Sequence, residues 1–194
     1  ILQSKKINRM KFVYDDMRWC RDPLPPFQRL DSSVVLALLS EAKKLGISVA
    51  IQAPSMNDAQ LALDAGVSAI VRGVPDTRFG SSTVDQMVQR NTYYVSTLSL
   101  FEYLADAEGF FKNVFADSLF RTSLPKTVVA EFTSSEFAIK QREQFPNFIY
   151  AKEHLPIVYD NCEAIVKNYV PVPMGTDIPY LPGISAHLEL ENLV

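Results

Sequence analysis

The sequence has 194 residues, of which 47% are hydrophobic and 21% are charged. A chain of this length and composition can bury a core of its own, which excludes a disordered polymer and a fibrous repeat. The formal net charge is −3 and no basic run could cover a phosphate backbone, so we expect no nucleic-acid partner. No apolar run reaches the ~18 residues of a membrane span, so we expect no membrane partner. The location stays open, with the cytoplasm favoured, because the natural N-terminus is not seen.

Cysteine and histidine are scarce in this chain. Cys20 and Cys162 are far apart and form no C-x-x-C motif, which excludes a disulfide framework and a zinc finger. The only histidines are His154 and His187, so this chain alone cannot build a site with three histidine ligands. The chain starts at Ile1 rather than Met and stops inside an expected helix, and we therefore expect a part of a longer protein.

Apolar segments alternate with amphipathic ones over the first half of the chain. The β-rich run MKFVYDD, from Met10 to Asp16, comes first and is followed by a proline-rich loop. A helical period then starts at Asp31 or Ser32 and ends at Leu45 and Gly46. The same unit recurs, and we expect strands at 47–53, 68–73 and 92–99 and helices at 57–66 and 81–90.

The alternation breaks between Leu100 and Tyr169, where helical patterns replace strands. We expect a helical insertion there, then a last strand at Val170–Asp177 and the start of a helix in the segment HLELENLV. Strands that are apolar throughout and alternate with helices indicate a parallel sheet covered by helices. The fold class is therefore α/β, and five strands make either an open sheet or part of a (β/α)₈ barrel.

In both architectures the functional residues lie at the carboxyl ends of the strands. The polar residues at the expected strand ends are Lys11 with Asp15 and Asp16, Gln52, Arg72, Thr97 with Ser99, and Asp177. A single polar residue at a strand end is more often an ordinary loop contact, but a set that shares one edge indicates a site.

Several segments of the chain follow one another in an order that is typical of a known superfamily. The last two are the GTD sequence, which ends at Asp177, and the PGISAHLEL sequence after it. Together with MKFVYDD, VAIQA, DAQLALDAGVSAIVRG, YYVSTL and NCEAIVKNYVPVPMGTD, they resemble the metal-dependent amidohydrolase superfamily, in its imidazolonepropionase-like branch. The resemblance spans nearly the whole chain. It implies that residues 1–194 are the carboxyl-terminal part of one barrel domain, covering roughly strands four to eight, with the helical insertion at about 100–169. The first three strands and the flanking β-sandwich of such enzymes are absent.

The resemblance also implies a set of site residues and a divalent metal, zinc, that activates a hydroxide. Lys11 falls at the carboxylated lysine of the fourth strand, Gln52 and Arg72 at the metal-binding histidines of the fifth and sixth, and Asp177 at the aspartate of the eighth. Asp177 would be both metal ligand and acid–base catalyst. His187 would lie near the substrate, beside Gln52 and Arg72, unless it only caps or packs a helix.

Two of these positions depart from the pattern of the superfamily. The amide of Gln52 offers only a weak carbonyl oxygen to a metal, and the guanidinium of Arg72 stays protonated and offers no lone pair. The metal could therefore be lost from this chain. In that case we expect Arg72 to supply the counter-charge of Asp177.

Three functions stay open. The first is a hydrolase that acts, with metal assistance, on a C–N bond of a cyclic amide, dipeptide or similar small substrate, with Asp177 as acid and base. The second is a catalytically degraded relative that binds a small anionic ligand without metal, through Lys11 and Arg72. The third, weaker one is a purely structural subunit. The partner in the first two is a small molecule, and the sequence leaves its identity and a homo-oligomeric state open.

Overall fold

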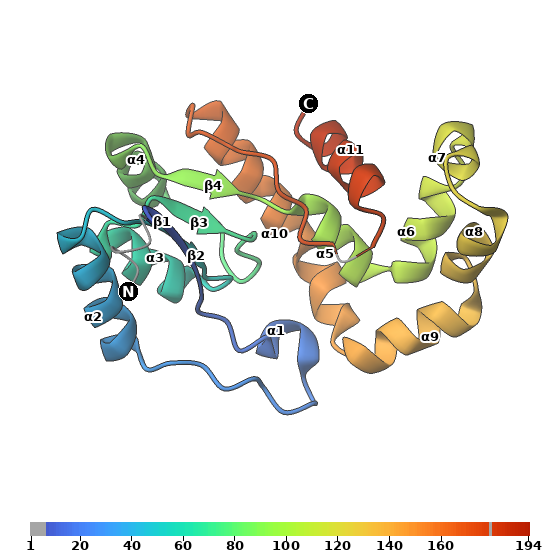
Figure 1. Cartoon of the computed structure of the whole chain (residues 1–194), viewed down its shortest axis with the longest axis horizontal. Helices are drawn as coiled ribbons and strands as arrows, with labels where there is room; N and C mark the ends of the chain where they lie inside the picture. The colour runs from blue at the N-terminus through green and yellow to red at the C-terminus, as the bar shows by residue number, and fades with distance from the viewer. Residues whose placement is uncertain (1–6, 179) are drawn as a thin grey trace. The chain divides into compact units, whose positions relative to one another are not determined.

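A parallel sheet of four strands organises the first part of the chain. The structure is a computed structural model that describes residues 7–178 and 180–194 (Figure 1). The strand order is β1–β2–β3–β4, and all three pairs are parallel. The bounds are β1 (Arg9–Val13), β2 (Ser48–Gln52), β3 (Ala69–Val71) and β4 (Tyr93–Val95). Each strand follows its predecessor directly in space, as in part of a barrel, so the predicted α/β class is confirmed.

Three helices connect these strands, and their ends follow the cap signals in the sequence. They are α2 (Ser32–Lys44), α3 (Met56–Ala65) and α4 (Ser81–Arg90). The hydroxyl of Ser55 accepts the N–H of Asp58 at the start of α3, and Gly66 closes that helix with a φ of 82°. A left-handed φ is easy for glycine, which explains why the helix ends there.

The chain divides into two compact units. The first, which we call the sheet unit, contains the described residues up to Asp16, Phe27–Thr97 and Pro156–Gly175. The second, the helical unit, contains Met17–Pro26, Leu98–Leu155 and Thr176–Val194. The predicted single barrel domain of residues 1–194 stays a prediction.

One face of the sheet carries the core of the sheet unit. Ile51 and Ile70 are fully buried there against side chains of α2, α3 and α4. Alternation along each strand places the neighbouring residues on the opposite face. That face is more open: Val13 and Tyr93 are about half exposed, at 56% and 43%. The two faces of the sheet therefore differ in burial: Lys11 on the open face is exposed, although Gln52 at the end of β2 on the same face is buried.

The helical unit has an aromatic core. Phe111 is fully buried and its ring lies 4.9 Å from that of Phe132 and 5.5 Å from that of Phe137. The predicted helical insertion is confirmed, because the described residues from 98 to 169 form helices and loops without a strand. The remaining helices are α1 (Arg18–Arg21), α5 (Leu98–Ala105), α6 (Ala107–Val114), α7 (Ser118–Thr122), α8 (Lys126–Phe132), α9 (Ser135–Gln144), α10 (Phe148–Lys167), which contributes to both units, and α11 (Pro182–Asn192).

The predicted last strand at Val170–Asp177 is wrong. These residues form no strand, although the N–H of Tyr94 donates to the carbonyl oxygen of Pro171 over 3.0 Å. Pro171 and Pro173 have no N–H to donate, so a regular ladder beside β4 cannot form. The predicted strand at 92–99 is also shorter than expected, because Leu98 and Ser99 already belong to α5.

In the part of the chain that the structure describes, no helix combines the length and the apolar character needed to cross a membrane.

Candidate functional site at the carboxyl edge of the sheet

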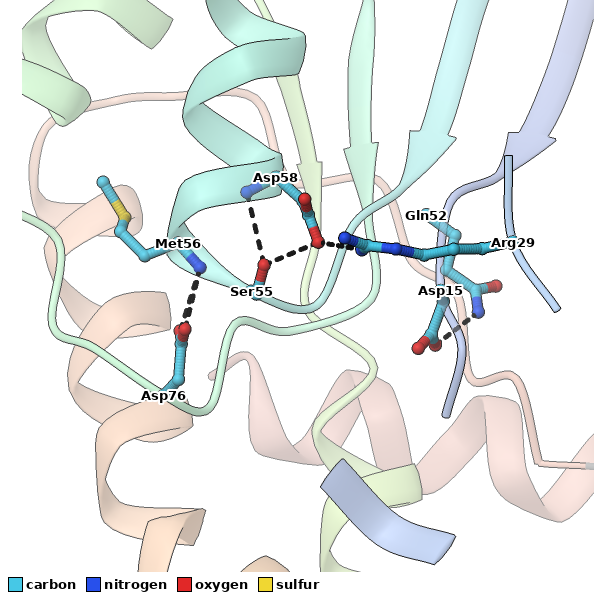
Figure 2. Close-up of polar contacts among 7 residues, drawn as sticks. All are labelled: Asp15, Arg29, Gln52, Ser55, Met56, Asp58 and Asp76. Atoms are coloured by element: carbon cyan, nitrogen blue, oxygen red, sulfur yellow. Dashed lines mark hydrogen bonds and ion pairs between the residues drawn. The ribbon is translucent and has the colours of Figure 1, made fainter. Parts of the chain in front are cut away.

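A buried carboxylate joins the ends of the first three strands. Asp15 lies two residues after β1, and its Oδ2 atom accepts a hydrogen bond from Gln52 Nε2 over 3.0 Å and another from Arg72 Nη1 over 3.0 Å. The side chains of Asp15 and Arg72 are only 1% and 8% exposed. The Asp15–Gln52 contact is drawn in Figure 2. The edge of the sheet therefore contains an internal ion pair with an amide as its third member.

The backbone at this edge is strained. Arg72, directly after β3, has a φ of 78°, and Thr97, two residues after β4, has a φ of 51°. The left-handed region is uncommon for residues other than glycine, and a β-branched side chain such as that of threonine makes it an outlier. Strain of about 1–3 kcal/mol per residue is typical of functional sites that the surrounding structure holds in place. Thr97 Oγ1 is also buried and has no hydrogen-bond partner among the described residues.

A second group of polar contacts surrounds the start of α3 (Figure 2). Arg29 Nη1 lies 2.7 Å from Asp58 Oδ2, which also accepts the hydroxyl of Ser55 over 2.7 Å. From the loop after β3, Asp76 accepts the N–H of Met56 over 3.0 Å. Burial raises the pKa of Asp76 more than this N–H lowers it. Both carboxylates stand at a helix N-terminus, where negative charge is stabilised.

The loop that carries Arg72 is held by a side chain of α10. Asn161, which is 1% exposed, donates from Nδ2 to the carbonyl oxygens of Val74 over 2.8 Å and Thr77 over 2.9 Å. Its Oδ1 accepts the N–H of Phe79 over 2.7 Å. One amide thus satisfies three backbone groups of the loop, which keeps the backbone after β3 in a single conformation.

We expect Asn161→Ala to destabilise the chain by about 2–4 kcal/mol, because three backbone groups would lose their partner. Urea denaturation followed by circular dichroism measures this. The matched control is Asn168→Ala, since among the described residues the exposed Asn168 side chain bonds a single group, the carbonyl oxygen of Ala164 in α10. We expect that change to cost less than about 0.5 kcal/mol. Equal effects of the two substitutions would show that Asn161 does not brace the loop.

The predicted site residues are only partly brought together. Gln52 and Arg72 meet on Asp15, whereas Lys11 lies in the middle of β1, exposed, and forms no ion pair within the described residues. Asp177 is exposed and has a φ of 52°, and it belongs to the helical unit. The partner of Arg72 within its own unit is Asp15, and the expected pair between Arg72 and Asp177 stays a prediction.

His187 lies on the exposed side of α11. Its Nε2 is 3.0 Å from Glu191 Oε1, and its ring stands edge-on to that of Phe120, with the centroids 5.3 Å apart. These contacts are those of a helix-surface residue. Its role in substrate binding stays a prediction.

The sequence gives no clear sign of Glu189, a fully buried residue on the same helix. Its Oε1 accepts the N–H of Leu98 over 2.9 Å, and its Oε2 accepts the N–H and the hydroxyl of Ser99 over 2.9 Å and 2.6 Å. Glu189 therefore caps α5, the helix that begins directly after the strained Thr97. The available signal was a carboxylate flanked by leucines in a helix, a pattern that also fits an exposed residue.

The donors at the sheet edge do not fit the metal that the resemblance implies. A ligand position is taken by the guanidinium of Arg72, which has no lone pair and already donates to Asp15. Within residues 7–178 and 180–194, no three histidine, cysteine, aspartate or glutamate side chains stand close enough to hold a metal ion. A dication here would meet the fixed positive charge of Arg72 instead of a lone pair.

Comparisons with known proteins bear on the fold. No protein-family model matches the chain, and no curated protein matches its sequence. Among solved structures, it is similar to a Xaa-Pro dipeptidase with methionine bound in the active site, with a TM-score of 0.60, 18% identity and coverage of 98% of this chain and 39% of that one. It is also similar to the ochratoxinase of A. niger, with a TM-score of 0.61, 16% identity and coverage of 97% and 35%.

These likenesses extend over almost all of this chain, although it spans little more than a third of either protein. At such low identity they bear on the fold and not on the chemistry. They confirm the α/β fold with a partial barrel that the sequence predicts, and membership of the amidohydrolase superfamily stays a prediction.

Proposed function

We propose that the chain is part of an amidohydrolase-like barrel that binds a small anionic ligand at the carboxyl edge of β1, β2 and β3 without a metal ion. The observation that carries this proposal is the buried pair of Arg72 and Asp15, whose guanidinium stands where a metal ligand is expected. A buried carboxylate needs a counter-charge, and Arg72 supplies it permanently. Zinc would have to displace an internal cation to bind there.

A cation on the sheet offers a contact for an anion. Arg72 pairs with Asp15 and Gln52 is neutral, whereas Lys11, in the middle of β1, forms no ion pair with a described residue. Lys11 points to the open face, since its neighbours Met10 and Phe12 pack into the core, and Gln52 lies on the same face of β2. A small carboxylate could bind the ammonium of Lys11 in a charge-assisted hydrogen bond.

Titration calorimetry with zinc and NMR titration with acetate test this proposal. We expect no stoichiometric zinc binding with a Kd below about 1 µM. We expect acetate to shift the NMR signal of the Gln52 side-chain amide at lower concentrations than acetamide, its neutral isostere, and Lys11→Met to abolish the difference. The matched control is Lys44→Met, because Lys44 pairs with Glu41 on the surface of α2. Tight zinc binding, or an acetate-induced shift of Gln52 that Lys11→Met leaves intact, would overturn the proposal.

Metal-assisted hydrolysis of a C–N bond is the second candidate function. It is supported by the likeness in fold to a dipeptidase and an ochratoxinase. It is also supported by Asp177, the last residue of the GTD sequence, which has a left-handed backbone conformation. In this alternative Asp177 acts as acid and base, with Gln52, Arg72 and His187 near the substrate. Zinc-dependent hydrolysis of a dipeptide that is lost in Asp177→Asn would favour it over the anion-binding function.

A further inference from the structure

The helical unit contains a pocket that is lined by residues of this unit alone. Its volume is about 200 Å³, and its walls come from the end of α5, the start of α6, the end of α9 and the start of α10. Pockets for drug-sized ligands have roughly 300–1,000 Å³, so this one suits a smaller molecule. The lining residues that carry the argument are Tyr103, Gln141, Arg142, Phe145, Phe148 and Lys152.

A buried amide with a donor to spare lines this pocket. Gln141 is only 7% exposed, and its Oε1 accepts the hydroxyl of Tyr103. Its Nε2 carries two N–H bonds, and Tyr180 accepts one of them over 3.3 Å. Burial raises the pKa of Tyr103, so this phenol stays protonated and remains a donor. The second N–H of Gln141 has no acceptor among the described residues.

Two cations stand at the same pocket. Lys152 forms no ion pair within the described part of the chain. Arg142 lies over the ring of Phe148, with its Cζ atom 5.5 Å from the centroid, and is 3.9 Å from Glu108. That carboxylate is closer to Lys112, at 2.7 Å, so it balances Arg142 only partly.

Asp106, the carboxylate among the residues that line the pocket, already accepts a hydrogen bond. Asp106 caps α6 by accepting the N–H of Gly109 over 3.0 Å, so the helix N-terminus offsets its charge. Positive charge therefore prevails in the pocket. The aromatic residues Phe145 and Phe148 supply an apolar surface beside it.

We propose that this pocket binds a small carboxylic acid with a flat apolar group, its carboxylate held by Lys152, Arg142 and the second N–H of Gln141 and its apolar part placed against Phe145 and Phe148. Two cations and a buried amide donor suit the two oxygens of one carboxylate. The ring of Phe148 holds the Arg142 guanidinium in place, which lowers the cost of ordering it on binding.

Benzoate is the probe for this pocket, and benzamide is its neutral isostere. We expect benzoate to bind the chain with a Kd of about 1 mM or tighter and benzamide at least about tenfold more weakly. The measurements are titration calorimetry and the NMR shift of the Gln141 side-chain amide. A shift at Gln141 reports binding in this pocket and not at the sheet edge.

Two substitutions test the cations, and neither should disturb folding because both side chains extend to the surface. Lys152→Met and Arg142→Met are each expected to weaken benzoate binding about tenfold and to leave benzamide binding unchanged. The matched control is Lys140→Met, on α9 beside the pocket, because Lys140 pairs with Glu136 and does not line it. We expect benzoate to bind this variant as it binds the unchanged chain.

Three outcomes would overturn the proposal. The first is that benzoate does not bind up to about 10 mM, several times the expected Kd. The second is that benzamide binds as tightly as benzoate, which would mean that the pocket recognises only an apolar ring. The third is that the benzoate-induced shift of the Gln141 side-chain amide survives both cation substitutions.

Discussion

Arg72→Met is expected to lower the free energy of unfolding by about 3–5 kcal/mol, the cost of leaving a buried carboxylate without its counter-charge. The Asp15 side chain is 1% exposed, and Gln52 would still donate a hydrogen bond to its Oδ2. A neutral donor stabilises a carboxylate less than a guanidinium does. Urea denaturation at pH 7 measures the loss.

A second substitution separates charge from packing. In the Arg72→Met background, Asp15→Asn removes the charge that lost its partner, and we expect it to recover at least half of the lost stability. The matched control is Arg78→Met, because Arg78 pairs with Asp160 over 2.6 Å where both side chains are largely exposed. Exposed pairs contribute about 0–1 kcal/mol, so that variant should stay close to the unchanged chain. If Arg78→Met and Arg72→Met lower the free energy of unfolding by the same amount, burial of the Asp15–Arg72 pair does not add to its contribution to stability.

Glu189→Gln is expected to lower the free energy of unfolding by about 3 kcal/mol or more, although it changes neither the size nor the shape of the side chain. The two carboxylate oxygens of Glu189 accept three hydrogen bonds from Leu98 and Ser99. A glutamine has one acceptor oxygen, and its NH₂ group would face a donor. The start of α5 would then carry an unsatisfied N–H in a fully buried place.

The control for Glu189 lies two residues further along the same helix. Glu191 is exposed and pairs only with His187 in the described contacts, so we expect Glu191→Gln to cost less than about 0.5 kcal/mol. Thermal unfolding of the two variants side by side gives the comparison. A Glu189→Gln chain as stable as the Glu191→Gln chain would contradict the capping role.

The regular part of the fold was predictable because its signals are local. The predicted helix from Asp31 or Ser32 to Leu45 matches α2 to within a residue at each end, and the helix predicted at 81–90 has the bounds of α4. The strand predicted at Val170–Asp177 does not form. Its apolar residues favour a strand, but the two prolines in it prevent regular pairing. The signal needed to avoid that error was present in the sequence.

The candidate site was harder to predict because its contacts join residues far apart in the chain. The sequence places Lys11, Asp15 and Asp16 together at the end of one strand, yet Asp15 bonds Arg72, 57 positions away. The positive φ of Arg72 turns its side chain out of the alternation that a regular strand would impose, so strand periodicity could not place it. Asn161 and Glu189 bond backbone groups more than 80 positions away, and no sequence pattern specifies such partners.

The segment beside β4 has a consequence for how this sheet meets other chains. The carbonyl oxygen of Pro171 takes up the N–H of Tyr94, and a Cβ atom on Gly175 would lie only 2.6 Å from Val95 Cγ1, so the segment runs very close to the edge strand. Two imino acids in it cannot donate onward, and a foreign strand that arrived here would find no continuous row of N–H groups to extend. The two prolines thus end the sheet on the β4 side, because they lack the N–H groups that a further strand would need. This edge is thereby protected against pairing with strands of other chains.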